Sequence, residues 1–336
     1  MTQPIVHIIA TGGTIAGIAA SSTARAYVPG SLSIQDMLAS VPELSTLAKL
    51  TSEQLFNIDS VDMSHSHWLD LSRSIYAALD RPEVKGVVVA HGTDTLEETA
   101  YFLDLVRTSN KPIVLVGSMR SASALSADGP MNLYNAIALT QDQQASDQGV
   151  MVVMNDLVFS ARQVTKLNTA GLDAFAAKDS QPLARISFGS VRWFDSTGLR
   201  SLQHRFNVVL SNPEKLPHVV LLTMHVGFDE GLLTTLIKSN SPAGLVIAGM
   251  GAGNLPARLG SALTLAQERG VPVVRSTRLP NGAVTPNYNN LDLNFGLIQS
   301  GYLSAVKSRI LLMLALLKSN KHEVLQHIFD QEGYAL

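Results

Sequence analysis

The amino-acid sequence predicts an α/β fold in which helices alternate with the strands of a mostly parallel sheet. Apolar, β-branched runs recur along the chain, and their continuous character indicates strands buried on both faces. Amphipathic stretches separate these runs, as in parallel sheets with right-handed crossovers. A chain of 336 residues also exceeds the usual size of a single core, which favours two domains. The predicted strands lie at 5–10, 87–90, 112–117, 150–155, 219–224, 245–249 and 271–276, and the predicted helices at 96–106, 131–140, 232–238, 261–269 and 303–319.

The predicted elements fall into two groups on either side of a segment without clear periodicity. Residues 178–216 contain Gly, Ser and Pro and are typical of an extended connection with room for a hairpin. We therefore expect an N-terminal catalytic α/β domain at 1–192 and a linker at 193–215. A smaller C-terminal α/β domain is expected at 216–336.

Composition narrows the classes of function. The net charge of −2 and the lack of a basic block argue against a nucleic-acid partner. The absence of cysteine excludes thiol catalysis, disulfides and cysteine–zinc sites. The longest apolar run, 310–317, is far shorter than the roughly 20 residues of a membrane-spanning helix, so no membrane association is expected. No signal-peptide pattern precedes the first predicted strand; we expect a cytoplasmic protein, or a periplasmic one if a signal peptide was removed.

Three polar loops directly follow predicted strands. Open α/β sheets form their ligand sites at the carboxyl ends of the strands, which makes these loops the first candidates for a site. They are TGGT at 11–14, HGTDT at 91–95 and GAGN at 251–254.

The first loop places the hydroxyl of Thr14 directly after two glycines, which permit a tight turn and a close backbone approach. Its spacing matches neither the dinucleotide nor the P-loop motif, so a structural turn, a ligand loop and a nucleophile loop all stay open. The nine histidines show no metal-ligand spacing, and no metal site is predicted. His65 and His67 are expected in an exposed loop.

The second loop carries more polar groups than a helix start requires. Thr95 and Glu98 fit a capping box, which leaves Thr93 and Asp94 without a structural role. Hydroxyl and carboxylate groups at a strand end are suited to orient a water or to hold a ligand ammonium. Lys166, in VTKLN, is either a solvated surface lysine or, if buried beside a threonine, a base for its hydroxyl.

Together these loops resemble the bacterial-type L-asparaginase family, especially its type II and glutaminase-asparaginase branch. TGGTIAG at 11–17 and HGTDTLEETAYF at 91–102 form a highly specific pair at this spacing, and similarity runs over nearly the whole chain. The resemblance implies a flavodoxin-like parallel sheet in the large N-terminal domain and a smaller C-terminal α/β domain. It also implies a homotetramer, built as a dimer of intimate dimers. The implied reaction converts L-asparagine to aspartate and ammonia through a threonine acyl-enzyme, without metal or cofactor.

The resemblance also implies roles for matching residues. Thr14 matches the nucleophile, and Tyr27 matches the tyrosine that works with it. Ser60 matches the serine that binds the substrate α-carboxylate. The remaining matches are the second catalytic group, Thr93, Asp94 and Lys166, and Asn254, which would reach in from a neighbouring subunit.

Two positions depart from the family pattern. Many members have glutamine after the carboxylate-binding serine, where this chain has Val61. Many also carry a glutamate where the alignment places Asn289, and Asp292 is the nearest carboxylate. Both positions contact the substrate α-ammonium in the family, and a charged hydrogen bond is worth roughly 1.5–3 kcal/mol. Either neighbouring groups compensate and asparagine is hydrolysed, or α-amino recognition is weakened and the substrate is a succinamate-like monoamide.

Two further alternatives stay open from the sequence. One is a broader glutaminase-asparaginase. The other is a non-catalytic amino-acid-binding protein on the same fold. Binding alone does not need two nucleophile-type hydroxyls with a lysine, so the intact Thr14, Thr93, Asp94 and Lys166 argue for an enzyme.

Overall fold

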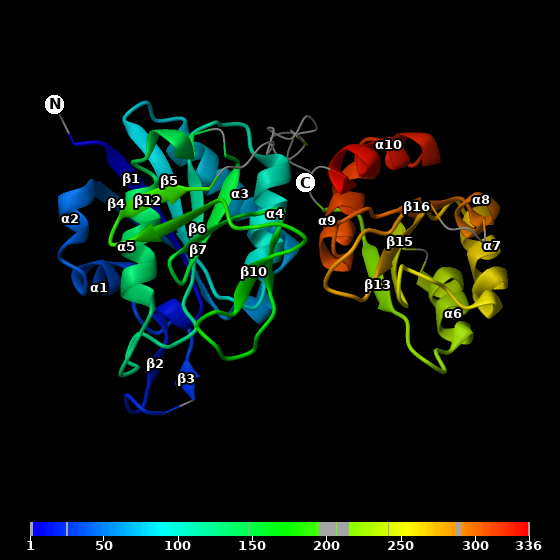
Figure 1. The fold of residues 1–336 in the computed structure, drawn as a ribbon, viewed down its shortest axis with the longest axis horizontal. Coiled ribbons are helices and arrows are strands. Elements are labelled where there is room, and N and C mark those ends of the chain that lie inside the picture. The colour runs from blue at the N-terminus through cyan, green and yellow to red at the C-terminus, as the bar shows by residue number, and fades with distance from the viewer. Residues whose placement is uncertain are drawn as a thin grey trace. The chain divides into compact units, whose positions relative to one another are not determined.

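The chain folds into two compact units, Met1–Ser201 and Leu202–Leu336 (Figure 1). The structure is a computed structural model, and it describes residues 3–24, 26–146, 148–194, 206, 215–240, 242–286 and 290–334. Most of the predicted linker at 193–215 lies outside the described residues.

The first unit is built around one mixed sheet with the strand order β12-β11-β8-β7-β6-β5-β1-β4. Its five strands from β7 to β4 are parallel, and the other three are antiparallel. In chain order those parallel strands follow the 2-1-3-4-5 arrangement of flavodoxin-like sheets, as expected. The strands are β1 (Ile5–Gly12), β4 (Lys49–Ile58), β5 (Val84–Ala90), β6 (Ile113–Val116), β7 (Val150–Met154), β8 (Leu157–Ser160), β11 (Ala184–Ser187) and β12 (Ser190–Trp193).

The first unit also has a topological switch point. β1 lies between β4 and β5 and runs parallel to both. The connections that follow β1 and β5 leave the sheet toward opposite sides at such a point, which opens a crevice at the carboxyl ends of the strands. The loops TGGT and HGTDT therefore start at the two borders of one crevice.

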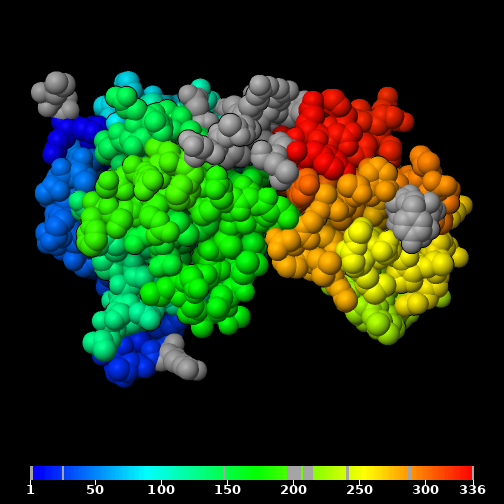
Figure 2. Space-filling model, viewed as in Figure 1, coloured from blue at the N-terminus to red at the C-terminus, as the bar shows by residue number. Residues whose placement is uncertain are grey.

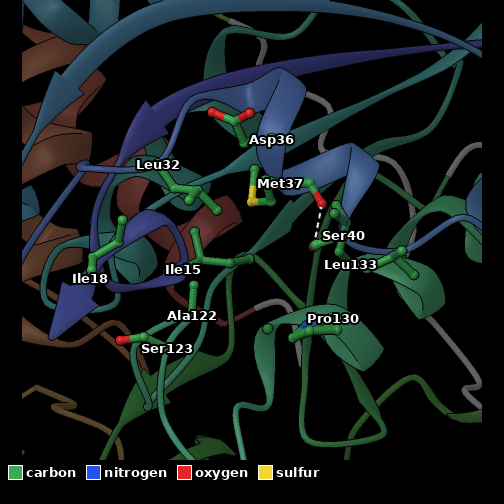
Figure 3. Close-up of a pocket in the computed structure, with 12 residues that line it drawn as sticks. Ile15, Ile18, Leu32, Asp36, Met37, Ser40, Ala122, Ser123, Pro130 and Leu133 are labelled. Atoms are coloured by element: carbon green, nitrogen blue, oxygen red, sulfur yellow. Dashed lines mark hydrogen bonds between the residues drawn. The ribbon is translucent and has the colours of Figure 1, made fainter. Parts of the chain in front are cut away.

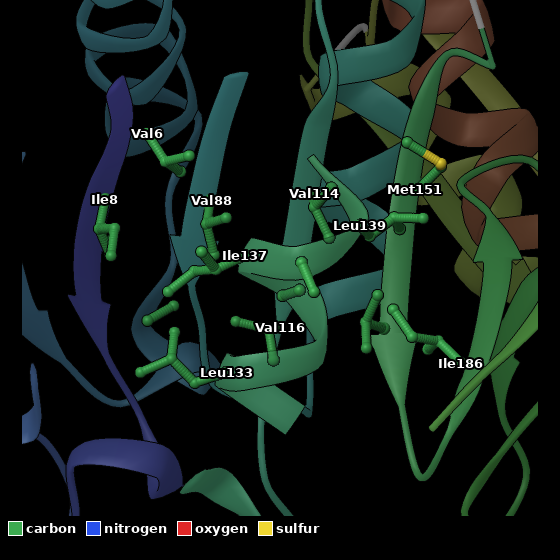
Figure 4. Close-up of a cluster of buried hydrophobic side chains, with 14 of the residues drawn as sticks. Val6, Ile8, Val88, Val114, Val116, Leu133, Ile137, Leu139, Met151 and Ile186 are labelled. Carbon is green, nitrogen blue, oxygen red and sulfur yellow. The ribbon is translucent and has the colours of Figure 1, made fainter. Parts of the chain in front are cut away.

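Helices cover both faces of this sheet. Alternate strand residues point to opposite faces, and Val6, Val88 and Val114 pack with Leu133 and Ile137 of α5 on one side (Figure 4). The other face is covered by α3 and α4, which pack on β5 and β7. The burial of both faces confirms the interpretation of the continuous apolar runs. The helices are α1 (Ile34–Ala39), α2 (Leu44–Leu47), α3 (His65–Leu79), α4 (Leu96–Val106) and α5 (Gly129–Leu139).

Two short antiparallel ribbons extend from the first unit near the crevice. β2 (Ile18–Ala19) pairs with β3 (Tyr27–Val28), and β9 (Val164–Lys166) pairs with β10 (Phe175–Ala177). The β2–β3 hairpin stands out from the surface of this unit, at its lower edge in Figure 2. These ribbons carry Tyr27 and Lys166, two of the predicted site residues.

The second unit is a smaller parallel sheet with helices, as predicted. Its strand order is β13-β14-β15-β16, and every pairing is parallel. Its core includes Leu245 and Ile247 of β14, packed with Leu263 of α7. The elements are β13 (Val219–Thr223), α6 (Glu230–Asn240), β14 (Gly244–Gly249), α7 (Gly260–Glu268), β15 (Val273–Thr277), α8 (Leu291–Phe295), β16 (Leu297–Gln299), α9 (Ala305–Ala315) and α10 (His322–Gly333).

Two local expectations are wrong. His65 and His67 do not lie in a loop: they begin α3, where the Ser64 side chain accepts from the His67 backbone and the His67 ring accepts from the Ser64 backbone. Thr95 precedes α4 but forms no side-chain cap. Across the described residues, no helix is both long enough and apolar enough to cross a membrane.

Candidate active site

The loops after β1 and β5 meet backbone to backbone at the switch point. A Cβ on Gly13 would lie 2.3 Å from the Gly92 Cα, so only glycine fits there, and Gly13 has a φ of 78°. The Gly13 N–H also donates to the Ile58 carbonyl at the end of β4 (2.9 Å). The close approach of Gly13 to Gly92 brings together the two loops that continue into Thr14 and Thr93.

Thr14 shares a hydrogen bond with Tyr27. The Thr14 Oγ1 and the Tyr27 hydroxyl are 2.7 Å apart. Tyr27 reaches this position from β3, where it pairs with Ala19 of β2, and its ring lies over Gly17. Thr14 is buried, whereas Tyr27 is 36% exposed, so the pair lies at the border between protein and solvent.

The hairpin that carries Tyr27 is anchored by the segment after β6. The Ala122 N–H donates to the Gly17 carbonyl (2.9 Å), and the Ser123 hydroxyl accepts from the Ala19 N–H (2.8 Å). The sequence pointed to no role for Ala122 and Ser123, because the small residues of SASA at 121–124 give no sign of a hydrogen bond to a partner about a hundred residues away in the chain. The anchoring segment restrains the position of the Tyr27 hydroxyl.

A second polar group forms around Lys166. Its ammonium donates to the Thr93 hydroxyl oxygen (2.9 Å) and pairs with the Asp94 carboxylate (2.6 Å). The Lys166 side chain is 17% exposed and that of Asp94 is 53% exposed. Lys166 is therefore not a solvated surface lysine. Because the Thr93 oxygen accepts from Lys166, the Thr93 hydroxyl proton is directed away from the lysine and is available to a ligand.

Ser60, just after the end of β4, is hydrogen-bonded to the loop that follows β5. Its buried hydroxyl oxygen accepts from the Asp94 N–H (3.2 Å), and its carbonyl accepts from the Thr95 hydroxyl (2.8 Å). This second bond explains why Thr95 does not cap α4. Val61, the next residue, is 62% exposed and presents an apolar side chain where the loop turns to solvent.

His91 is the first residue of the second loop, and its side chain is fully buried. Burial lowers its pKa to about 4, so the imidazole is neutral at pH 7. Its Nδ1 lies 2.7 Å from the Gly92 carbonyl, and as the neutral ring must donate to a carbonyl, the proton is on Nδ1. His91 is a scaffold for the loop rather than a group that reaches the crevice.

The other predicted residues lie in the second unit. Asn254 closes a tight loop after β14, in which the backbones of Met250 and Asn254 exchange hydrogen bonds. Asn289 lies outside the described residues. Asp292 is buried and accepts two hydrogen bonds of 2.6 Å from Arg275, so its carboxylate is occupied within this unit. Asp292 therefore does not take the place of the family's glutamate as a partner for a substrate ammonium.

The structure thus gathers six predicted residues of the first unit at the carboxyl ends of neighbouring strands, where the Gly13 and Gly92 backbones meet. Thr14, Tyr27, Ser60, Thr93, Asp94 and Lys166 come from the ends of β1, β4 and β5 and from the two ribbons. Elsewhere in the described chain, no cluster of three or more His, Asp or Glu side chains is placed to hold a metal ion. Two hydroxyls, one held by a tyrosine and one by a lysine, are equipped for nucleophilic attack and for donation to a substrate.

Comparison with known proteins places the chain among amidohydrolases over nearly its whole length. The family model "Asparaginase, N-terminal" matches residues 5–197, and "Glutaminase/Asparaginase C-terminal domain" matches residues 218–329. L-asparaginase 2 of Escherichia coli K12 is 38% identical over 98% of this chain and 94% of its own length. The glutaminase-asparaginase of Acinetobacter glutaminasificans is also 38% identical, over 96% of this chain and 98% of its own.

A solved structure shows the same likeness in three dimensions. The crystal structure of a probable cytoplasmic L-asparaginase from Campylobacter jejuni superposes with a TM-score of 0.92. It is 37% identical in sequence, and the match covers 98% of this chain and all of that one (100%). The likeness therefore includes both units.

Proposed function

We propose, from the premise that this chain belongs to the asparaginase family of amidohydrolases, that it hydrolyses the side-chain amide of L-asparagine to aspartate and ammonia. The observation that carries this proposal is the pair of hydroxyls at the switch point, Thr14 beside Tyr27 and Thr93 beside Lys166. Amide hydrolysis needs a nucleophile, a donor for the carbonyl oxygen and a proton for the leaving nitrogen. Each of these has a candidate in the crevice.

The first half-reaction forms an ester on Thr14. The Thr14 oxygen attacks the amide carbon, and its proton passes to the Tyr27 hydroxyl, which lies 2.7 Å away and releases its own proton to the amide nitrogen. The carbon–nitrogen bond then breaks, and ammonia leaves. A neutral threonine is a weak nucleophile, so the proton relay is what makes the attack effective.

The Lys166 group stabilises charge during this step. Its ammonium holds the Thr93 oxygen at 2.9 Å, and the Thr93 hydroxyl donates its proton to the substrate. Asp94 balances the lysine charge and presents a half-exposed carboxylate to a substrate ammonium. Water then attacks the ester carbon, its proton returns through Tyr27 to the Thr14 oxygen, and the free carboxylic acid is released.

The nucleophile is tested by Thr14→Ala and Thr14→Ser. Loss of the attacking oxygen should reduce ammonia release by roughly a thousandfold or more, whereas the serine variant should keep part of the activity. Acid-quenched enzyme with substrate should carry an acyl group on the peptide that contains Thr14, detected by mass spectrometry. Wild-type turnover in Thr14→Ala, or an acyl group on the peptide that contains Thr93, would reject this assignment. A wild-type protein that releases no ammonia from any amide would be a binding protein.

Val61 supports a second candidate, an amidase with weakened α-amino recognition. A 62% exposed valine beside Ser60 offers no hydrogen bond to a substrate ammonium. A succinamate-like monoamide lacks that ammonium. Ammonia release from L-asparagine, D-asparagine, L-glutamine and succinamic acid, measured side by side, separates this enzyme from an asparaginase and from a glutaminase-asparaginase. Val61→Gln should raise kcat/KM for L-asparagine and leave that for succinamic acid unchanged if the second candidate is right.

We further propose a homotetramer, a dimer of intimate dimers in which Asn254 contributes to a neighbouring subunit's site. Its support is the family membership of the chain. Light scattering gives the mass of the assembly, and a mixture of inactive Thr14→Ala and Asn254→Ala subunits should regain activity if the site is shared.

We also propose a cytoplasmic location, supported by the likeness to the Campylobacter jejuni protein, which is described as a probable cytoplasmic L-asparaginase. Cell fractionation tests this location.

A further inference from the structure

A cavity of about 290 Å³ lies directly behind the nucleophile loop in the first unit (Figure 3). It is bounded by the segment after β1, by β2, by α1 and by the start of α5. The side chains of Ile15, Leu32 and Met37 gather around its middle. Its volume is just below the range of small-molecule sites, which begins at about 300 Å³. The reaction proposed above makes no use of this cavity.

The cavity touches the segments that position the nucleophile. Ile15 directly follows Thr14 and is buried in the cavity wall. Ile18 of β2 is a second wall residue, and its neighbour Ala19 is the residue that pairs with Tyr27. A ligand in the cavity would therefore contact Ile15, next to the nucleophile, and Ile18 of β2, the strand that pairs with the strand carrying Tyr27.

One charged group lines this otherwise mainly apolar cavity. The Asp36 carboxylate, which is exposed to solvent, stands at its edge, above Met37 in Figure 3. Its Oδ2 accepts from the Ser33 hydroxyl (2.6 Å), and its Oδ1 has no hydrogen-bond donor among the described residues. The hydroxyls of Ser40 and Ser123 are already engaged with the Met37 carbonyl and the Ala19 N–H. Asp36 is thus the polar group that is available to select a ligand.

We propose that this cavity binds a small apolar amine, whose ammonium pairs with Asp36 and whose hydrocarbon part packs against Ile15, Leu32 and Met37. Occupancy shifts the β2–β3 hairpin and so changes the activity at Thr14. The binding claim stands on the cavity alone, whereas the effect on activity rests on the proposed function. The two parts are therefore measured separately.

Binding is tested with n-hexylamine, with hexan-1-ol as the neutral match and hexanoate as the anionic one. Calorimetry on the intact protein should show saturable binding of the amine, about two- to fivefold tighter than that of the alcohol, because an ion pair with an exposed carboxylate is screened by water. Hexanoate should not bind. Binding should persist when aspartate fills the catalytic crevice, since the two sites are distinct.

Variants of the cavity residues test whether the amine binds in the cavity. Asp36→Asn should weaken amine binding by about two- to fivefold and leave alcohol binding unchanged, whereas Asp80→Asn, which alters an equally exposed carboxylate outside the cavity, should change neither. Ser40→Trp should block the cavity and remove binding of both probes. No saturable binding, displacement by aspartate, or amine binding unaffected by Asp36→Asn would overturn the proposal. The Asp36 comparison suffices if Ser40→Trp does not fold.

The coupling is tested by hydrolysis kinetics with the amine present. Saturating hexylamine should change kcat/KM by about fivefold or more in the wild type, the lower end of usual coupling, and by much less in Asp36→Asn at the same concentration. Aspartate should change the amine affinity by the same factor as the amine changes that of aspartate, because coupling is reciprocal. Tight amine binding with unchanged kinetics and unchanged aspartate affinity would overturn the regulatory part.

Discussion

Replacing Tyr27 with phenylalanine removes one oxygen from the proposed relay and leaves the rest of the hairpin in place. The ring would keep its position over Gly17, and the β2–β3 pairing uses only backbone groups. Thr14 would lose its 2.7 Å partner and retain its own hydroxyl. The variant therefore separates proton transfer from the shape of the site.

The structure sets different magnitudes for stability and catalysis. A neutral, half-buried hydrogen bond contributes about 1 kcal/mol to folding. In a unit of this size that corresponds to a melting-temperature change of about 2–4 °C. A positioned proton-transfer group contributes roughly 10²–10⁴-fold to the rate. We therefore expect kcat to fall by that factor, with little change in KM and only a small change in melting temperature.

Ammonia release under substrate saturation, together with thermal unfolding, measures both quantities. Tyr134→Phe is the matched control, because it removes a tyrosine hydroxyl on α5 away from Thr14, and it should leave kcat unchanged. A Tyr27→Phe variant with wild-type kcat would refute the relay. A loss of activity accompanied by a large loss of melting temperature would point to a structural role instead.

Three further perturbations have outcomes that the structure predicts. Gly13→Ala should lower both stability and activity, since its Cβ would lie 2.3 Å from the Gly92 Cα at a φ of 78°, a strain of about 1–3 kcal/mol, measured by denaturant unfolding and ammonia release. Asp292→Asn should destabilise the second unit by about 3–5 kcal/mol, because the buried Arg275 would lose its carboxylate; urea unfolding gives the value. Burial lowers the pKa of His91 from its ordinary 6.5 to about 4, so the unfolded chain binds the proton more readily than the folded one. His91 should therefore lower stability as pH falls from about 6.5 to 4, by about 3 kcal/mol at most, and melting curves of His91→Asn should lack this contribution.

Local sequence patterns were sufficient to predict the buried strands, but they missed the half-buried strand β4 and the helix α3. The runs that became β1, β5 and β7 are short, mostly apolar and rich in β-branched residues, which favours buried strands over helices. β4 was missed because its residues are only half buried and its sequence, KLTSEQLFNI, mixes polar and apolar side chains. α3 was missed because SHSH at its start is unusual for a helix, although Ser64 and His67 supply its cap.

The candidate site was likewise predictable in part. The loops around Thr14 and Thr93 follow strands whose carboxyl ends meet at one edge of a parallel sheet, so the topology rule alone predicts their proximity. Lys166 offered no such signal, since a lysine on a short ribbon is ordinary in sequence. Its role depends on a contact with Thr93, 73 positions away in the chain.

Residue types and their order along the chain were enough to specify an α/β fold, the loops at the strand ends and the chemistry available there, because burial periodicity and turn composition are local properties. The resemblance implied that Tyr27 works with Thr14, and the folded chain supplied the hydrogen bond between them. Only the folded chain decided that Thr95 bonds to Ser60 instead of capping a helix, and that Asp292 is occupied by Arg275. These pairings depend on which segments the sheet order brings within about 3 Å, the distance at which a hydrogen bond forms. No local pattern encodes that distance.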